Sequence, residues 1–191
     1  HIMSSAGLHK RTIDLDTGVA FYEFGYDQDK NLTSVTDQFG NTTTIRRDGG
    51  GAPYEIVSPD GLVTSLTIDS SNHLTQITYP DGAFYGFEYT GEGLLTVKVE
   101  PENNRFEHEF DELGRLTDSF DENGGHWSFQ RDADEQGNVH ANTLTAEGAG
   151  TSYLDQTKST GVYASTITDS FGTVTSYEQA SDGLTVTKAL S

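Results

Sequence analysis

The sequence predicts an all-β fold, an array of about nine antiparallel β-hairpin repeats that form a twisted or spiralling β-ribbon. Three observations predict it. Several residue columns recur every 21 residues, the segments between them alternate apolar with polar side chains, and no segment sustains the apolar spacing of a helix. Because only 33% of the 191 residues are hydrophobic, a thin layered structure is favoured over a thick core.

The turn columns define the repeat. Asp accepts hydrogen bonds from nearby backbone N–H groups, and Gly adopts positive φ without strain, so both residue types favour turns. The glycine column breaks only at Asn103 and the aspartate column only at Thr90, and both replacement residues suit a turn. We expect nine residues to lie in the repeat turns, namely Gly40, Gly61, Gly82, Gly124, Asp27, Asp48, Asp69, Asp111 and Asp132.

The strand columns predict the buried face. Successive side chains of a strand point to opposite faces, so Tyr85, Phe87 and Tyr89 share one face. The following units carry Phe106, His108 and Phe110, and then Trp127, Phe129 and Arg131, in the same columns. Together with a leucine column, they give a predicted repeat core of Leu74, Leu95, Leu116, Tyr85, Phe87, Tyr89, Phe106, Phe110, Trp127 and Phe129.

The pattern also predicts how the chain is organised. Residues 1–3 are interpreted as a tag remnant, and residues 4–148 as the regular repeat array. After Gly124 the glycines leave the 21-residue grid, so residues 149–191 are interpreted as degenerate repeats that continue the same array. A change of structural role near Gly148, such as a cap, is the alternative.

The charge balance narrows the classes of partner. A formal net charge of −19 repels nucleic acids and anionic lipids, so we expect no nucleic-acid partner. No apolar stretch is long enough to span a membrane, which predicts no membrane insertion, and no segment has the apolar core of a signal peptide. The absence of cysteine excludes disulfides, cysteine–zinc sites and thiol catalysis.

We expect no catalytic, metal or cofactor site. Asp27, Asp29 and Asn31 have the spacing that opens a calcium loop, but Leu32 and Gln38 occupy the positions that need Gly and Glu. These carboxylates are therefore interpreted as turn residues. The histidines lack metal-ligand spacing, and no nucleophile-elbow motif is present. One binding hypothesis remains, because Trp127, Tyr85 and Tyr89 are candidates for stacking on sugar rings if their face is open.

The repeat columns resemble a known family. The segments Tyr26-Asp27 with Leu32-Thr33, and Phe110-Asp111 with Gly114-Arg115-Leu116-Thr117, are similar to the YD repeat of Rhs proteins. That family includes bacterial Rhs effectors, the C components of Tc toxins, and teneurins. The resemblance implies a secreted or surface-exposed bacterial protein, in which spiralled β-ribbons enclose a C-terminal toxin. The self-cleavage motif of the toxin branch is absent, so no catalytic residue is carried over.

Two functions follow as expectations. The first is a structural, non-enzymatic module, a fragment of a larger shell that encapsulates a C-terminal toxin or effector domain. Its partners would be neighbouring repeats and the enclosed toxin, and unpaired strand edges would allow edge-to-edge self-association. The alternative is an extracellular adhesion module that binds glycan or protein through exposed aromatic residues.

Overall fold

The computed structural model describes residues 1–158, 160–180, 182–183 and 186–190. These residues contain β-strands and turns but no helix, which confirms the predicted all-β antiparallel class. None of them forms a helix long and apolar enough to cross a membrane. The chain divides into two compact units, residues 1–103 (unit 1) and residues 104–191 (unit 2).

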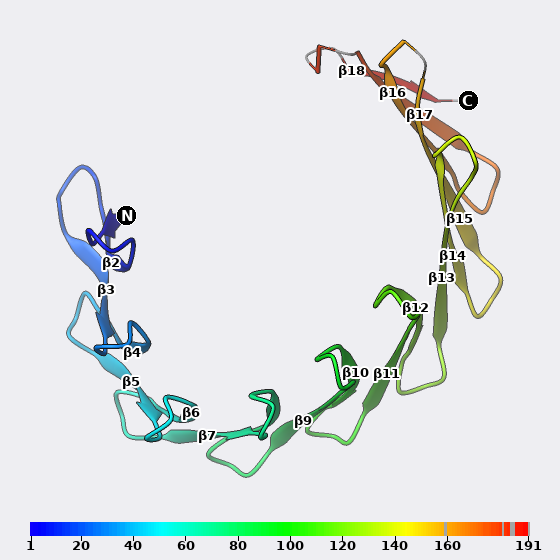
Figure 1. Cartoon of the computed structure of the whole chain (residues 1–191). Coiled ribbons are helices and arrows are strands. Elements are labelled where there is room, and N and C mark those ends of the chain that lie inside the picture. Colours follow the sequence, from blue (N-terminus) through cyan, green and yellow to red (C-terminus); the bar gives the residue numbers. More distant parts are fainter. Residues whose placement is uncertain (159, 181, 184–185, 191) are drawn as a thin grey trace. The chain divides into compact units, whose positions relative to one another are not determined.

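Unit 1 is an antiparallel meander in which each strand pairs with the next (Figure 1). Short polar turns separate segments rich in Thr, Val, Ile and aromatic residues, which suit a pleated sheet. Its strands are β1 (Ile2–Met3), β2 (His9–Ile13), β3 (Ala20–Tyr26), β4 (Leu32–Asp37), β5 (Thr42–Arg47), β6 (Pro53–Val57), β7 (Val63–Ile68), β8 (Leu74–Thr78), β9 (Phe84–Tyr89) and β10 (Leu95–Val99).

Unit 2 repeats this arrangement, again with antiparallel pairing between successive strands. Its strands are β11 (Arg105–Phe110), β12 (Leu116–Phe120), β13 (His126–Ala133), β14 (Val139–Thr145), β15 (Gly150–Thr157), β16 (Tyr163–Thr168), β17 (Val174–Gln179) and β18 (Val186–Leu190). Strands β13, β14 and β15 are long, with eight, seven and eight residues, whereas β16 to β18 have five or six.

Each unit is a single layer of sheet, so neither has a conventional core. Among the described residues only Val97 and Ala164 are buried, with 5% and 7% of their surfaces exposed. Many other apolar side chains are half-buried, because they are shielded by neighbours in the sheet rather than by a second layer, and eighteen large ones are exposed in the part of the chain that the structure describes. The thin structure expected from the low apolar content is therefore what the chain forms.

Candidate interaction face

The strand register of unit 1 separates its side chains into two unlike faces. Directly paired residues of antiparallel strands share a face, so the register extends a face from strand to strand. What we call the aromatic face carries Tyr22, Phe24, Val35, Ile45, Ile56, Leu66, Ile77, Tyr85 and Phe87. The opposite, polar face carries Glu23, Thr36, Thr44, Arg46, Glu55, Ser65 and Gln76. One side of unit 1 therefore carries most of the aromatic rings. The other side is more polar, although it also carries Val57, Val63, Phe84 and Val97.

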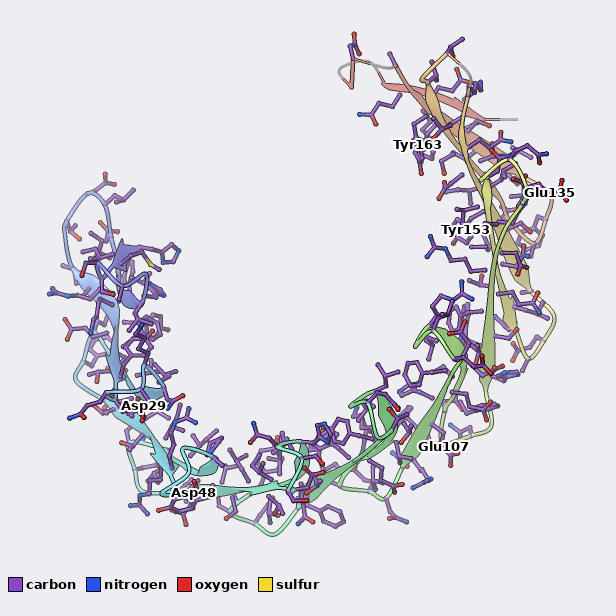
Figure 2. The ribbon with its side chains drawn as sticks, in the orientation of Figure 1. Asp29, Asp48, Glu107, Glu135, Tyr153 and Tyr163 are labelled. Carbon is purple, nitrogen blue, oxygen red and sulfur yellow. The ribbon has the colours of Figure 1, made fainter. Side chains whose placement is uncertain are left out.

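Unit 2 has the same two-sided character. Its aromatic face carries Phe106, His108, Phe110, Trp127, Phe129, Tyr153, Tyr163, Ile167 and Tyr177. Its polar face carries Glu107, Glu109, Asp118, Ser128, Asn142 and Ser152. Figure 2 shows Tyr153 and Tyr163 on one side of this sheet and Glu107 on the other.

The residues predicted as repeat core lie in strands of these sheets, and nine of the ten are half-buried. Trp127 differs, because half of its surface is exposed. The difference has a simple cause: a single layer shields a side chain only from its flanks, and the large indole extends beyond its neighbours Ser119 and Thr145. An aromatic face of this kind is not covered by other described residues of its own unit.

A recurrent turn reverses the chain at nearly every hairpin. In the turn that Asp37 opens, the Gly40 N–H donates to the Asp37 carbonyl at 3.1 Å, and the Asp37 N–H donates to the Asn41 carbonyl at 3.0 Å. The Asp37 carboxylate accepts from the N–H groups of Phe39 and Asn41 at 2.8 and 2.9 Å. Gly40 has a φ of 85°, a conformation that glycine adopts freely. The Asp37 carboxylate thus satisfies the free N–H groups of the turn, and Gly40 supplies its positive φ.

The structure places most of the predicted turn residues in such turns. Gly40, Gly61, Gly82 and Gly124 have φ between 81° and 88°. Asp27, Asp48, Asp69 and Asp111 each accept backbone N–H groups through a carboxylate oxygen. Where the aspartate column breaks, the Thr90 hydroxyl accepts from the N–H groups of Glu92 and Leu94 instead. Where the glycine column breaks, Asn103 has a positive φ of 67°.

Asp132 is the exception and requires a correction. It lies in β13, paired with His140, and the turn opens two residues later at Asp134. A shift of two residues leaves every side chain on its original face, because strand side chains alternate with period two. Strand β13 can therefore be two residues longer without changing which side chains face which side, although the turn then no longer falls on the 21-residue spacing. Asp121, Asp134 and Asp169 also open turns, and each precedes a turn glycine by three positions.

The turn hydrogen bonds alter the acidity of the carboxylates. The Asn41 side chain and backbone lower the pKa of Asp37 from its ordinary 3.8. Backbone donation from His73 lowers the pKa of Asp69, and from Thr173 that of Asp169. Because these groups are bonded as carboxylates, they act structurally. Asp27 is held in the same way by Asn31, which accounts for one carboxylate of the apparent calcium-loop motif. No metal-binding cluster of three such ligands occurs among the described residues.

Two of the three candidate stacking residues are already engaged within unit 1. Tyr89 donates its hydroxyl to the Leu74 carbonyl at 2.8 Å, and its ring stacks on His73 with centroids 4.8 Å apart. The Lys98 ammonium lies over the Tyr85 ring at 5.6 Å. Of the three, Trp127 leaves the most surface open.

A hollow of about 630 Å³ indents the aromatic face of unit 2. Its lining on this face includes Phe129 and Arg131 of β13, Ala141 and Thr143 of β14, and Tyr153 of β15. Gln130, Asp132 and Asn142, which alternate with them along the strands, also line it. The turn residues Asp111 and Arg115, whose carboxylate and Nε lie 2.7 Å apart, lie at its margin. Arg131 was recognised in the aromatic columns, but the hollow was not predicted, because it depends on which residues pair across three strands.

The repeated hairpin, its carboxylate-capped turn and the two-faced single layer together define a YD-repeat shell segment. The sequence matches the family described as Teneurin YD-shell over residues 2–189. The chain belongs to this family, which confirms the resemblance noted in the sequence.

Relatives and solved structures agree with this assignment. Mouse teneurin-3 is 38% identical over 118 residues, which cover 61% of this chain and 4% of that protein. Mouse teneurin-4 is 32% identical over 148 residues, which cover 77% of this chain and 5% of that protein. The crystal structure of TcdB2-TccC3 without its hypervariable C-terminal region has a TM-score of 0.60 at 10% identity, covering 97% of this chain and 12% of that one. The structure of the Photorhabdus luminescens Tc holotoxin pore has a TM-score of 0.59 at 10% identity, covering 87% of this chain and 10% of that one. These two structures share the fold.

The comparisons also correct one expectation. A bacterial secreted or surface location is contradicted, because the curated relatives, which include human teneurin-1 at 32% identity over 142 residues, are animal proteins. The hairpin and turn chemistry serves shells of either origin equally, so the repeat pattern alone could not separate them. The chain spans 4% to 5% of the length of these relatives. It is a structural module of the shell type.

Proposed function

We propose that this chain is a segment of the wall of a closed YD-repeat shell, with its aromatic face turned toward the enclosed side. The observation that carries the proposal is the uncovered aromatic face, since only Val97 and Ala164 are buried among the described residues. A wall has to present one packing face along its whole length, and the register provides that face in each unit. The predicted core residues would be covered there by neighbouring parts of the longer protein.

In this proposal the wall acts by containment. The continuous backbone ladders close the sheet to solvent within each unit, and the polar face keeps the outside soluble. The enclosed partner would be a toxin or effector domain that follows the shell in the same polypeptide. The similarity to the Tc toxin structures supports this order of parts, and the teneurin family supports a scaffold without catalytic activity.

Protease protection in the full-length parent protein tests containment. The domain that follows the shell should survive proteinase K in the intact parent and be digested quickly when it is expressed alone. A parent in which the wall is weakened, for example by Val97→Asp, should lose the protection. Digestion of the domain at the same rate in the intact parent and alone would contradict the proposal.

A further inference from the structure

The hollow of unit 2 has a local structural cause. Ala141 pairs with Arg131 on one side and with Tyr153 on the other, so the three side chains share the aromatic face. Arg131 and Tyr153 are two strands apart, about 9–10 Å, and only a methyl group lies between them. The result is a slot with Ala141 as its floor and two long side chains as its walls. Figure 2 shows Tyr153 projecting from this face.

The residues that border the slot combine aromatic rings with hydrogen-bonding groups. Phe129 pairs with Thr143 next to the Arg131–Ala141 pair, so a second ring and a hydroxyl group border the slot. Tyr153 is 36% exposed. A volume of about 630 Å³ lies within the range of pockets that hold small ligands, which are typically lined by aromatic residues and a few polar groups.

Few charged side chains surround the hollow. Its lining includes Arg115, Arg131, Asp111 and Asp132, but Asp132 directly follows Arg131 in β13, so its side chain lies on the opposite face. Arg115 is already paired with Asp111 at 2.7 Å. An anionic ligand would meet Asp111 and the net charge of −19, and a cationic ligand would meet the Arg131 guanidinium group. A neutral ligand that offers both donors and acceptors suits this lining best.

We propose that the hollow binds a neutral sugar ring of a glycan. The C–H face of a pyranose packs against the rings of Tyr153 and Phe129. Its hydroxyl groups, which donate and accept, are bound by the Arg131 guanidinium and the Thr143 hydroxyl. Trp127 lies two residues before Phe129 on the same face with half of its surface exposed, in position to pack against a second ring. This binding function is separate from containment. It requires the aromatic face of unit 2 to be open to solvent, because a wall closed over that face would exclude the glycan.

The single tryptophan of the chain makes the test direct. Trp127 fluorescence is titrated with four neutral hexasaccharides, built from maltose, cellobiose, chitobiose and mannobiose units, and with a heparin hexasaccharide and a hexaglutamate peptide as charged probes. We expect a saturable change with at least one neutral sugar and none with the charged probes.

Variants then locate the site. Ala141→Leu fills the slot and Tyr153→Ala removes one wall, so each should weaken binding about tenfold or more. Tyr22→Ala removes a tyrosine that is 49% exposed on the aromatic face of unit 1, and it should leave the affinity unchanged. Circular dichroism reports whether each variant is folded.

Three results would overturn the proposal. One is the absence of saturation with every neutral hexasaccharide at millimolar concentrations. Another is undiminished binding to folded Ala141→Leu, which would place the sugar elsewhere. The third is saturation by a charged probe in place of the neutral sugars, which would assign a different ligand class. None of these results bears on protease protection by the wall, so the two proposals fail independently.

Discussion

Units 1 and 2 build the same two-faced sheet from repeats of different length. In unit 1 the turns opened by Asp37, Ser58 and Tyr79 are 21 residues apart, whereas in unit 2 those opened by Asp121, Thr145 and Asp169 are 24 apart. The unit 1 hairpins β3–β4, β5–β6, β7–β8 and β9–β10 each contain a register shift, and so does β11–β12 at the start of unit 2. The later hairpins β13–β14 and β15–β16 contain none. The longer repeat thus replaces a bulged hairpin with a regular one.

The difference shows what the fold holds constant. The number of residues per repeat varies, but the turn and the side of the sheet that carries the aromatic residues do not. A bulge and a change of strand length both alter the residue count while keeping the side chains on their faces. The chemistry of the face does vary. Ile45, Ile56 and Leu66 fill it in unit 1, whereas Arg131, Ala141 and Thr143 leave the hollow in unit 2.

Substitutions at a buried and at an exposed valine of unit 1 test where burial stabilises the sheet. Val97→Asp puts a carboxylate at the most buried side chain of unit 1 and should cost more than about 3 kcal/mol or prevent folding. Val19→Asp, at a valine that is 49% exposed, should cost less than about 1 kcal/mol. Urea unfolding of both variants measures the difference. Equal losses would contradict the single-layer account.

A second prediction is that the turn is equivalent in both units despite the different repeat lengths. Gly61→Val in unit 1 and Gly137→Val in unit 2 place a branched side chain at φ of 87° and 80°, so each should cost about 1–2 kcal/mol. Lys30→Gly, at a φ of 69°, should instead stabilise by up to about 1 kcal/mol. Thermal unfolding compares the three variants. A marked difference between the two valine variants would show that the turns are not equivalent.

The two-residue displacement of the turn after β13 gives a third, smaller test. Asp134→Ala removes an acceptor of the Gln136 and Asn138 N–H groups and should lower the Tm by a few degrees. Asp132→Ala, in the exposed strand position, should leave the Tm nearly unchanged. If the 21-residue grid were the true guide to the turns, the order of the two effects would be reversed.

The pH dependence of the turns should change the free energy of unfolding by only a small amount for each carboxyl group. Hydrogen bonds lower the pKa of Asp37 and Asp69 in unit 1 and of Asp134 and Asp169 in unit 2. A carboxyl group whose folded pKa is depressed stabilises the fold fully above its unfolded pKa, near 3.8. That contribution is lost as the pH falls through the lower folded value. Urea unfolding between about pH 5 and about pH 2 should show falling stability, and Asp37→Asn should reduce the slope. A slope unchanged by this substitution would exclude Asp37 as a contributor.

Much of the fold followed from the sequence, because turn residues and strand alternation are local signals. The 21-residue columns located the turns at Gly40, Gly61, Gly82 and Gly124, and the period-two pattern separated Tyr85 and Phe87 from their polar neighbours. Asp132 was misplaced because a repeat grid assumes a constant length, whereas the fold requires only a constant face. The hollow was not predictable, since Arg131, Ala141 and Tyr153 meet through the register of three strands.

Thiol labelling measures whether the aromatic face is covered in the parent protein. The chain has no cysteine, so Thr43→Cys on the aromatic face and Thr44→Cys on the polar face form a matched pair on β5. A bulky maleimide–polyethylene glycol should label both variants in the isolated chain. In the parent it should label Thr44→Cys and spare Thr43→Cys. Equal labelling of the two variants in the folded parent would contradict a wall with one enclosed face.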